Sequence, residues 1–226
     1  MARAKPAQPA APARILIVDD HPAVREALLL RIGQVPDLQV CGQAEDVEDA
    51  LPLVRKEKPD AAIVDIALKT GDGIDLIKRI KKRNKDIRIL VWSMYGERLY
   101  AERALRAGAD GYITKEHATD RIVEAIREVL AGRIYLSPAM SAQMLHRVVG
   151  RRDKSDDQGW IASLSDRELE VFRLIGRGMK TADIAARLHL SMRTIWTYRD
   201  RIREKLQLAN GTELVRHATQ WVLENE

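Results

Sequence analysis

Five short apolar runs, each followed by a segment with helical periodicity, constrain the fold of this chain more than any other feature. The runs are RILIV, LQVCGQA, DAAIVDI, IRILVW and ADGYIT, in that order. Runs that are apolar at nearly every position are typical of strands buried on both faces of a parallel sheet, with helices as the crossovers. We therefore predict an α/β domain, built on a five-stranded doubly wound parallel sheet, over residues 14–132.

After the fifth run the alternation stops, and the remaining chain is predicted to contain helices only. Residues 1–13 are rich in Ala and Pro and carry no core-forming side chains, which predicts a disordered tail. Residues 133–159 are predicted to be a linker with one helix from Pro138, capped by Ser137. Residues 160–226 are predicted to form a small all-α domain, in which a short helix, a turn and a longer basic helix make a helix-turn-helix.

The composition excludes several classes of protein. An apolar fraction of 46% with 31% charged residues is typical of a soluble globular chain. No apolar run approaches the length of a membrane span, and no signal peptide is evident. The one cysteine, Cys41, excludes an internal disulfide framework and is expected to be a buried thiol in a reducing compartment. We expect a cytoplasmic protein without a membrane partner.

The charge is distributed unevenly along the chain. Residues 14–133 carry 21 basic and 21 acidic side chains, whereas residues 187–205 carry six Lys and Arg against two acids. A solvated helix face accounts for many such clusters of like charge. A basic block on one predicted helix, supported by a recognition pattern, indicates a polyanionic partner.

Carboxylates end two predicted strands that lie side by side in such a sheet. Asp19 and Asp20 follow the first strand, and Asp65 ends the core of the third. Because the carboxyl ends of strands in an open sheet face one crevice, we expect these groups to meet. Three carboxylates repel one another unless a hard cation neutralises them, and oxygen ligands point to Mg²⁺. Lys115 and Ser93, which end two further strands, are placed to bind a phosphate.

Each of these residues also has an ordinary structural interpretation. Lys115 can pair with a surface acid, Ser93 can cap the helix that follows it, and Asp19 with Asp20 can cap the first helix. The position of all these groups at the carboxyl ends of four strands favours a shared site.

The motifs ILIVDDHP, IVDIALKTGDG, LVWSMY and GADGYITK resemble those of the receiver domain of two-component response regulators. The resemblance covers about residues 14–132. It implies that Asp65 is the phosphoacceptor, which attacks a phosphohistidine on a sensor histidine kinase, and that Mg²⁺ is the cofactor. The implied metal ligands are Asp19, acting partly through water, Asp20, Asp65 and the backbone carbonyl of Ala67. The implied phosphate-binding and switch residues are Ser93, Tyr112 and Lys115.

Two positions depart from the family pattern. Lys69 stands where a proline is common, and Tyr95 stands two residues after the switch hydroxyl, where a short side chain is common. Neither supplies the nucleophile, so they bear on the lifetime of the phosphoryl group. A DNA-binding regulator whose receiver acts without phosphorylation remains an alternative.

A second alternative is a Mg²⁺-dependent phosphohydrolase of the haloacid dehalogenase type, with Asp19 as the nucleophile. That class usually requires the pattern D-x-D, whereas Asp19 and Asp20 are adjacent here. We therefore expect a protein that is not an enzyme.

The longer basic helix, MRTIWTYRDRIREKL, is capped by Ser191 and presents two different faces. Ile195, Tyr198, Ile202 and Leu206 share the face predicted to be core. The opposite face combines donors, acceptors and an indole with flanking guanidiniums, as a base-reading helix does. These groups are Arg193, Trp196, Thr197, Asp200, Arg201 and Arg203. An ordinary amphipathic helix explains the apolar face equally well, but not an exposed Trp among arginines.

The segment from Leu164 to about Val222 resembles the LuxR-type DNA-binding domain, and the two resemblances together define the NarL/FixJ class of response regulator. They imply a transcription regulator that binds double-stranded DNA as a homodimer when phosphorylated. The expected DNA-binding residues are Lys180, Thr181, Arg193, Thr194, Trp196, Thr197, Asp200 and Arg203. The last helix is either a core helix or, as the family implies, part of the dimer contact. The expected dimer-contact residues are Leu214, Val215 and Ala218.

Overall fold

The computed structural model describes residues 11–68, 70–94, 96–115, 121–148, 160–161 and 163–225. The predictions for the N-terminal tail up to residue 10, for Lys69 and Tyr95, and for residues 116–120 and 149–159 lie outside the described residues. The chain divides into two compact units, residues 1–141 and 142–226, which are described one at a time. No helix within the described ranges is both long and apolar enough to span a bilayer.

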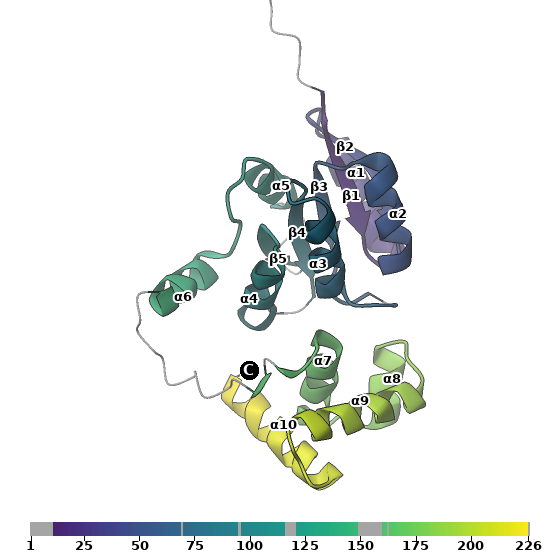
Figure 1. Cartoon of the computed structure of the whole chain (residues 1–226), viewed down its shortest axis with the longest axis vertical. Coiled ribbons are helices and arrows are strands. Elements are labelled where there is room, and N and C mark those ends of the chain that lie inside the picture. The colour runs from purple at the N-terminus through teal and green to yellow at the C-terminus, as the bar shows by residue number, and fades with distance from the viewer. Residues whose placement is uncertain are drawn as a thin grey trace, which may run out of the picture. The chain divides into compact units, whose positions relative to one another are not determined.

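The first unit contains the predicted five-stranded sheet (Figure 1). The strands are β1 (Ala13–Val18), β2 (Leu38–Ala44), β3 (Ala61–Val64), β4 (Arg88–Ser93) and β5 (Gly111–Thr114). Their order is β2-β1-β3-β4-β5, and each strand runs parallel to its neighbour. The order places β1 and β3 side by side, as predicted, so the residues that follow them reach the same edge of the sheet.

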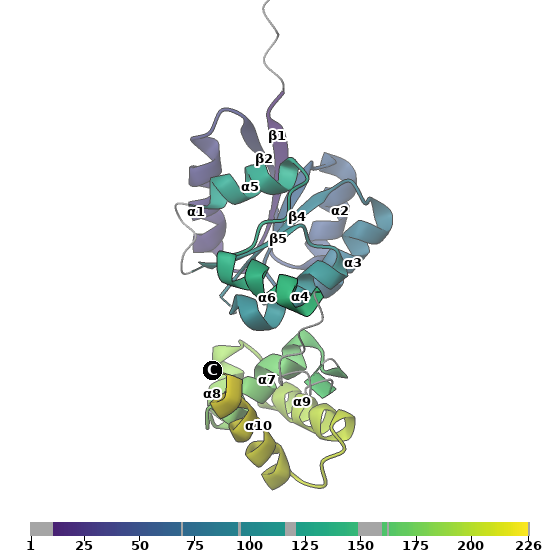
Figure 2. The ribbon, with the colours of Figure 1, turned by 90° about the vertical axis from the view of Figure 1, so that its left-hand side faces the viewer.

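Helices cover both faces of this sheet. They are α1 (Pro22–Gly33), α2 (Val47–Glu57), α3 (Gly73–Arg83), α4 (Glu97–Ala107) and α5 (Ile122–Leu130). Leu28 of α1 and Ile126 of α5 belong to one buried cluster with Ile17 and Ile63 of the sheet. Helix α3 adjoins both α2 and α4 in the other layer (Figure 2). Burial on two sides explains why the strand sequences are apolar at nearly every position.

The first unit extends beyond the predicted boundary at residue 132. The backbone N–H of Tyr112 donates to Tyr135 O at 2.8 Å, and the N–H of Tyr135 donates to Asp110 O at 3.1 Å. This segment therefore satisfies backbone groups at the open edge of β5. Helix α6 (Pro138–Val148) follows, and Ser137 caps its first turn as predicted.

The second unit is built around a central helix. Its elements are α7 (Asp166–Gly176), α8 (Thr181–Arg187), α9 (Met192–Lys205) and α10 (Gly211–Asn225), and α7 contacts the other three. The buried ring of Phe172 lies 5.4 Å from the ring of Trp160 and 6.0 Å from that of Trp221, between centroids. A Cβ at Gly176 would lie 2.4 Å from the carbonyl oxygen of Ala218, so glycine is required where α7 and α10 meet.

Two capping interactions fix the starts of α7 and α9. Ser165 and Glu168 form a capping box, and Lys205 Nζ lies 2.6 Å from the same Glu168 carboxylate. This ion pair joins the end of α9 to the start of α7. Ser191 Oγ accepts a hydrogen bond from the Thr194 N–H at 3.1 Å, which confirms the predicted cap of α9.

Candidate functional site

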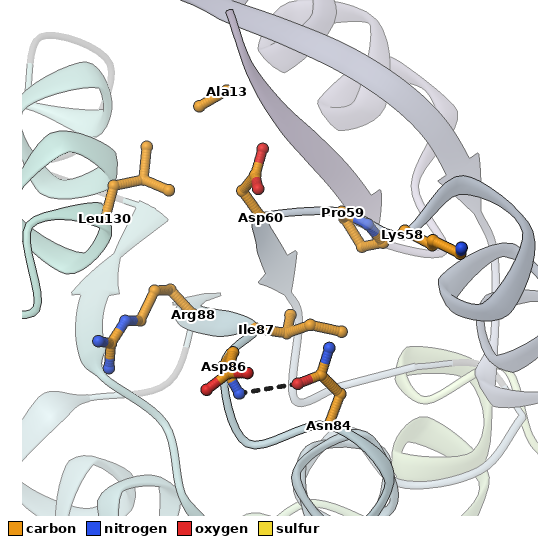
Figure 3. A pocket seen from close by; sticks show the side chains of 9 residues that line it. All are labelled: Ala13, Lys58, Pro59, Asp60, Asn84, Asp86, Ile87, Arg88 and Leu130. Atoms are coloured by element: carbon orange, nitrogen blue, oxygen red, sulfur yellow. Dashed lines mark hydrogen bonds between the residues drawn. The ribbon is translucent and has the colours of Figure 1, made fainter.

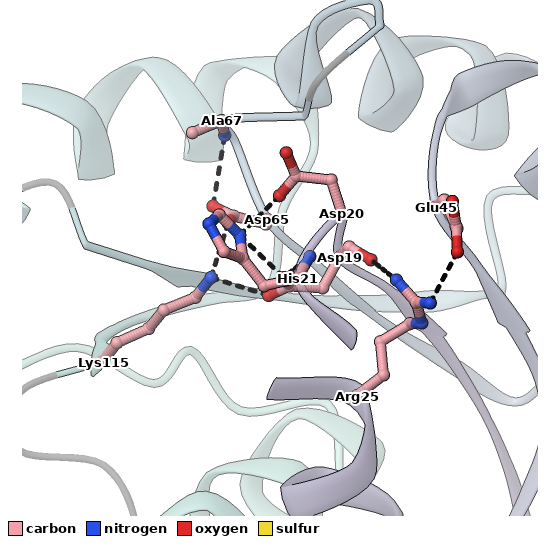
Figure 4. A network of polar contacts seen from close by, with 8 residues as sticks. All are labelled: Asp19, Asp20, His21, Arg25, Glu45, Asp65, Ala67 and Lys115. Carbon is pink, nitrogen blue, oxygen red and sulfur yellow. Dashed lines mark hydrogen bonds and ion pairs between the residues drawn. The ribbon is translucent and has the colours of Figure 1, made fainter. Parts of the chain in front are cut away.

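The carboxylates predicted to gather at the carboxyl edge of the sheet do lie together (Figure 4). Asp19 and Asp20 follow β1, and Asp65 follows β3. Ligand atoms of these three residues and of His21 all lie within 4.8 Å of one another. Asp19 and Asp65 are almost completely buried. A compact set of carboxylate oxygens fits a hard divalent cation such as Mg²⁺.

Lys115, which follows β5, lies between two of these carboxylates. Its Nζ is 2.6 Å from Asp19 Oδ2 and 2.5 Å from Asp65 Oδ2, and its side chain is buried. The ordinary interpretation, in which Lys115 pairs with a surface acid, is therefore wrong. The second oxygen of Asp65, Oδ1, accepts a hydrogen bond from the Ala67 N–H at 3.1 Å. Both oxygens of the Asp65 carboxylate are thus held in defined directions.

Burial and charge act against each other in this cluster. Burial and the neighbouring charge of Asp65 raise the pKa of Asp19, although Lys115 works to lower it. Burial works to lower the pKa of Lys115, but the charges of Asp65 and Asp19 outweigh it and raise that pKa above its usual value. Lys115 is therefore a stable cation at neutral pH, and it offsets part of the repulsion between the carboxylates.

Two side chains that the sequence interpretation missed, His21 and Arg25, also contact the acidic pair. His21 Nδ1 lies 2.6 Å from Asp20 Oδ1 and 3.5 Å from Asp19 Oδ1. Arg25, on α1, donates from Nη1 to the backbone carbonyl of Asp19 at 2.7 Å, and its Nη2 lies 2.7 Å from Glu45 Oε1. Asp19 lies before the start of α1, so no helical spacing in the sequence signals the Arg25 contact.

Ser93 and Tyr112 are completely buried near the same edge of the sheet. Their hydroxyl groups share a hydrogen bond, and burial raises the pKa of Tyr112 well above its ordinary value. Tyr112 therefore points inward in this structure, and its role as a switch residue stays a prediction. Helix α4 begins after Gly96 without a side-chain cap, so Ser93 does not serve as the cap of that helix.

A separate hollow of about 480 Å³ lies around the opposite, amino-terminal ends of the strands (Figure 3). Lys58, Asp60 and Arg88 are among its lining residues. The Asp60 carboxylate accepts a hydrogen bond from the backbone N–H of Arg14 at 2.7 Å, which holds the start of β1. None of the predicted site residues lines this hollow, so it is distinct from the acidic cluster.

The α9 helix has the two faces expected from its sequence. Ile195 and Ile202 are fully buried, whereas the Trp196 side chain is 54% exposed. Tyr198 and Leu206, predicted to be core, are half-buried. The other predicted DNA-binding residues differ in how far they are exposed. Lys180, Arg193, Thr197 and Asp200 are exposed, and Thr181, Thr194 and Arg203 are half-buried.

Arg199 is a further neighbour of Trp196 that the helical wheel did not single out. Its guanidinium carbon lies 5.3 Å from the centroid of the indole ring, which is within the range of a cation–π contact. Arg203 Nη1 lies 3.4 Å from Asp200 Oδ1. The exposed indole is therefore contacted by the guanidinium group of Arg199, and Arg203 pairs with Asp200 on the same helix.

The expected dimer contact needs correction at two of its three residues. Leu214 and Ala218 have no exposed surface, because α10 packs this side against α7 and α9. These two side chains belong to the domain core and are not available to a second chain. Val215 is 41% exposed and is the member of the set whose role in a dimer stays a prediction.

A parallel five-stranded sheet with an acidic pocket at its carboxyl edge, joined to a helix-turn-helix unit, defines a class of regulator. The family of response regulator receiver domains matches residues 15–127. The family described as bacterial regulatory proteins of the luxR type matches residues 162–218. The chain belongs to the NarL/FixJ class of two-component response regulators.

Similar proteins support this assignment over most of the chain. The response regulator GacA of Pseudomonas aeruginosa is 34% identical over 208 residues, which cover 90% of this chain and 96% of GacA. A LuxR-family response regulator from Aurantimonas sp. SI85-9A1 is 35% identical with a TM-score of 0.57, over 62% of this chain and 99% of that one. RcsB from Salmonella enterica serovar Typhimurium, bound to promoter rprA in the presence of the phosphomimetic BeF3-, is 25% identical with a TM-score of 0.57, over 92% and 98%. This chain is a transcriptional response regulator with a receiver and a LuxR-type DNA-binding domain.

Proposed function

We propose that Asp65 accepts a phosphoryl group from a phosphohistidine of a sensor histidine kinase. The observation that carries this proposal is the position of Lys115, whose ammonium group contacts the Asp65 carboxylate inside a buried acidic pocket. In the transfer, an Asp65 oxygen forms a bond to phosphorus while the bond between phosphorus and the kinase imidazole nitrogen breaks. The ammonium group of Lys115 then pairs with an oxygen of the transferred group.

The cation that this pocket fits is Mg²⁺. Asp19, Asp20, Asp65 and the backbone carbonyl of Ala67 are the proposed ligands, and their oxygen donors match its preference. When bound, Mg²⁺ supplies the positive charge that offsets the carboxylates and the incoming phosphoryl oxygens. Among this chain's own residues, Asp65 carries the nucleophilic oxygen and Ser93 supplies a hydroxyl donor.

The output of the proposed switch is binding of double-stranded DNA through the exposed face of α9. Trp196, Thr197 and Asp200 lie on that exposed face, where side chains can reach base edges. Arginines beside them suit phosphate contacts. RcsB, of similar fold, has been solved on a promoter with a phosphoryl mimic. We propose that residues 14–132 receive the signal, that residues 160–226 read a promoter, and that the protein works in the cytoplasm without turning over a substrate.

The proposal is tested by phosphoryl uptake from a small donor. The full chain, treated with acetyl phosphate and Mg²⁺, is expected to give a second, slower band on a phosphate-affinity gel. Removal of Mg²⁺ with EDTA is expected to abolish that band, because the carboxylates then repel the phosphoryl group. If the chain gives no second band at saturating donor and Mg²⁺, it acts without phosphorylation at Asp65.

Phosphorylation is also expected to shift the chain toward a dimer. A phosphoryl group adds roughly two negative charges, which draw in Ser93 and Lys115 and bias the surface near Tyr112. The coupled surface is expected to include α4 and α5. Light scattering with beryllofluoride and Mg²⁺ is expected to raise the mass from 25.6 kDa toward twice that value. Identical masses with and without the mimic, at concentrations that saturate DNA, would contradict this prediction.

A further inference from the structure

Arg25 links three elements around the acidic pocket without entering it (Figure 4). It lies in the first turn of α1, and its side chain is only 12% exposed. One guanidinium nitrogen donates to the backbone carbonyl of Asp19 at 2.7 Å, and the other lies 2.7 Å from a carboxylate oxygen of Glu45. Glu45 directly follows β2, the strand that pairs with β1. The planar guanidinium group therefore spans the ends of two neighbouring strands.

These contacts restrict the backbone that carries the acidic pair. The backbone N–H of Asp19 donates to Ala44 O at 3.1 Å, on β2. The carbonyl of the same residue is held by Arg25. Because that carbonyl belongs to the planar peptide group between Asp19 and Asp20, fixing its direction also fixes the position of the Asp20 Cα and so restricts where the Asp20 side chain can lie. Without Arg25, the turn after β1 has one fewer constraint at the point where two carboxylates must converge.

We propose that Arg25 is a positioning residue for the cation site, and that Glu45 holds Arg25 in place. Arg25 acts on the direction of Asp19 and Asp20 and makes no contact with the cation itself. This inference rests on the proposed function of the acidic pocket as a Mg²⁺ site. By this inference Arg25 strengthens Mg²⁺ binding, whereas its positive charge alone would weaken it.

The electrostatic effect and the positioning effect of Arg25 change the affinity for Mg²⁺ in opposite directions, so an experiment can separate them. A guanidinium group beside a cation site repels the cation, so a purely electrostatic Arg25 weakens Mg²⁺ binding and its removal strengthens it. A positioning Arg25 strengthens Mg²⁺ binding, so its removal weakens it. Lysine keeps the charge but lacks the planar pair of donors that spans Asp19 and Glu45. Arg25→Lys therefore leaves binding unchanged in the electrostatic case and weakens it in the positioning case.

The experiment measures the Kd of the full chain for Mg²⁺ alone, by isothermal titration, with the thermal midpoint of the metal-free protein beside it. Arg25→Lys, Arg25→Gln and Glu45→Gln are expected to weaken Mg²⁺ binding by roughly tenfold, the usual order for groups that orient metal ligands. Glu45 is 63% exposed, so Glu45→Gln is not expected to disturb folding. The matched control is Arg79→Gln, which breaks an exposed ion pair with Asp75 on α3 and is expected to leave the Kd unchanged.

A positioning role further predicts that added Mg²⁺ rescues the variants. Phosphoryl uptake from acetyl phosphate is expected to fall at low Mg²⁺ and to match the wild-type rate at saturating Mg²⁺. An unchanged or smaller Kd in folded Arg25→Lys and Glu45→Gln proteins would overturn the inference. A wild-type chain that binds Mg²⁺ but takes up no phosphoryl group would refute phosphorylation at Asp65 and leave the role of Arg25 standing. A wild-type chain that binds no Mg²⁺ would overturn both.

Discussion

We expect Asp65→Asn to abolish phosphoryl uptake while leaving the fold intact. The amide has the shape of the carboxylate but cannot act as the nucleophile. Its loss of charge also relieves repulsion with Asp19, which lies in the same buried cluster. The measurement is the shifted band on a phosphate-affinity gel after treatment with acetyl phosphate and Mg²⁺, together with a thermal melting curve.

The matched control for this change is Asp75→Asn, because Asp75 is an exposed carboxylate on α3. It is expected to take up phosphoryl groups like the wild-type chain. Full incorporation in the Asp65→Asn protein would place the acceptor on another residue. A lower thermal midpoint would indicate that the ion pair between Asp65 and Lys115 supports the fold more than repulsion opposes it.

Trp196→Ala and Arg203→Ala are expected to weaken DNA binding in different ways. Trp196 is exposed on α9, where an indole can contact a thymine methyl group or donate one hydrogen bond. Its loss is expected to weaken the preferred operator by roughly 1–3 kcal/mol and to leave non-specific binding nearly unchanged. Arg203→Ala is expected to weaken binding to all sequences alike and to lower the salt slope by about one unit, as loss of one phosphate contact does.

Binding isotherms on a selected operator and on random duplex DNA, at several salt concentrations, check both predictions. A melting curve serves as the folding control, and Trp196→Ala is expected to change the thermal midpoint little because the side chain is exposed. Loss of operator and random binding together, with a lower midpoint, would show that Trp196 supports the fold of α9. Sequence-dependent loss in Arg203→Ala would instead make Arg203 a base contact.

The elements and their pocket were predictable because both follow from local pattern. A sheet buried on two faces demands strands that are apolar at nearly every position, and such runs are visible in the sequence. In a parallel sheet the strands end at one edge, so Asp19, Asp65 and Lys115 converge from three separate runs. The exposed position of Trp196 likewise follows from the 3.6-residue period of α9.

Contacts between particular side chains were harder to predict from the sequence than the positions of those side chains on a helix or at a strand end. The wheel placed Trp196 on the outer face, but the cation–π contact with Arg199 depends on the rotamers of both side chains. In the same way, the pattern of strand ends predicted that Asp19 lies in the pocket, but it did not indicate that Arg25 binds the backbone carbonyl of Asp19. That contact requires the ends of β1 and β2 and the first turn of α1 to be placed together in space.

The sequence by itself determined the order of strands and helices, the carboxylates at the sheet edge and the two faces of the recognition helix, because periodicity is a property of neighbouring residues. Only the tertiary structure decided which apolar surfaces the chain covers with its own elements. From its sequence the last helix, α10, was compatible with a core or with a dimer contact. Leu214 and Ala218 are buried because α10 packs against α7, and glycine at 176 allows α7 to approach the backbone of Ala218. The segment around Tyr135 joins the first unit because the edge of β5 offers it backbone partners. Both outcomes depend on groups far apart in the chain, and no local pattern records them.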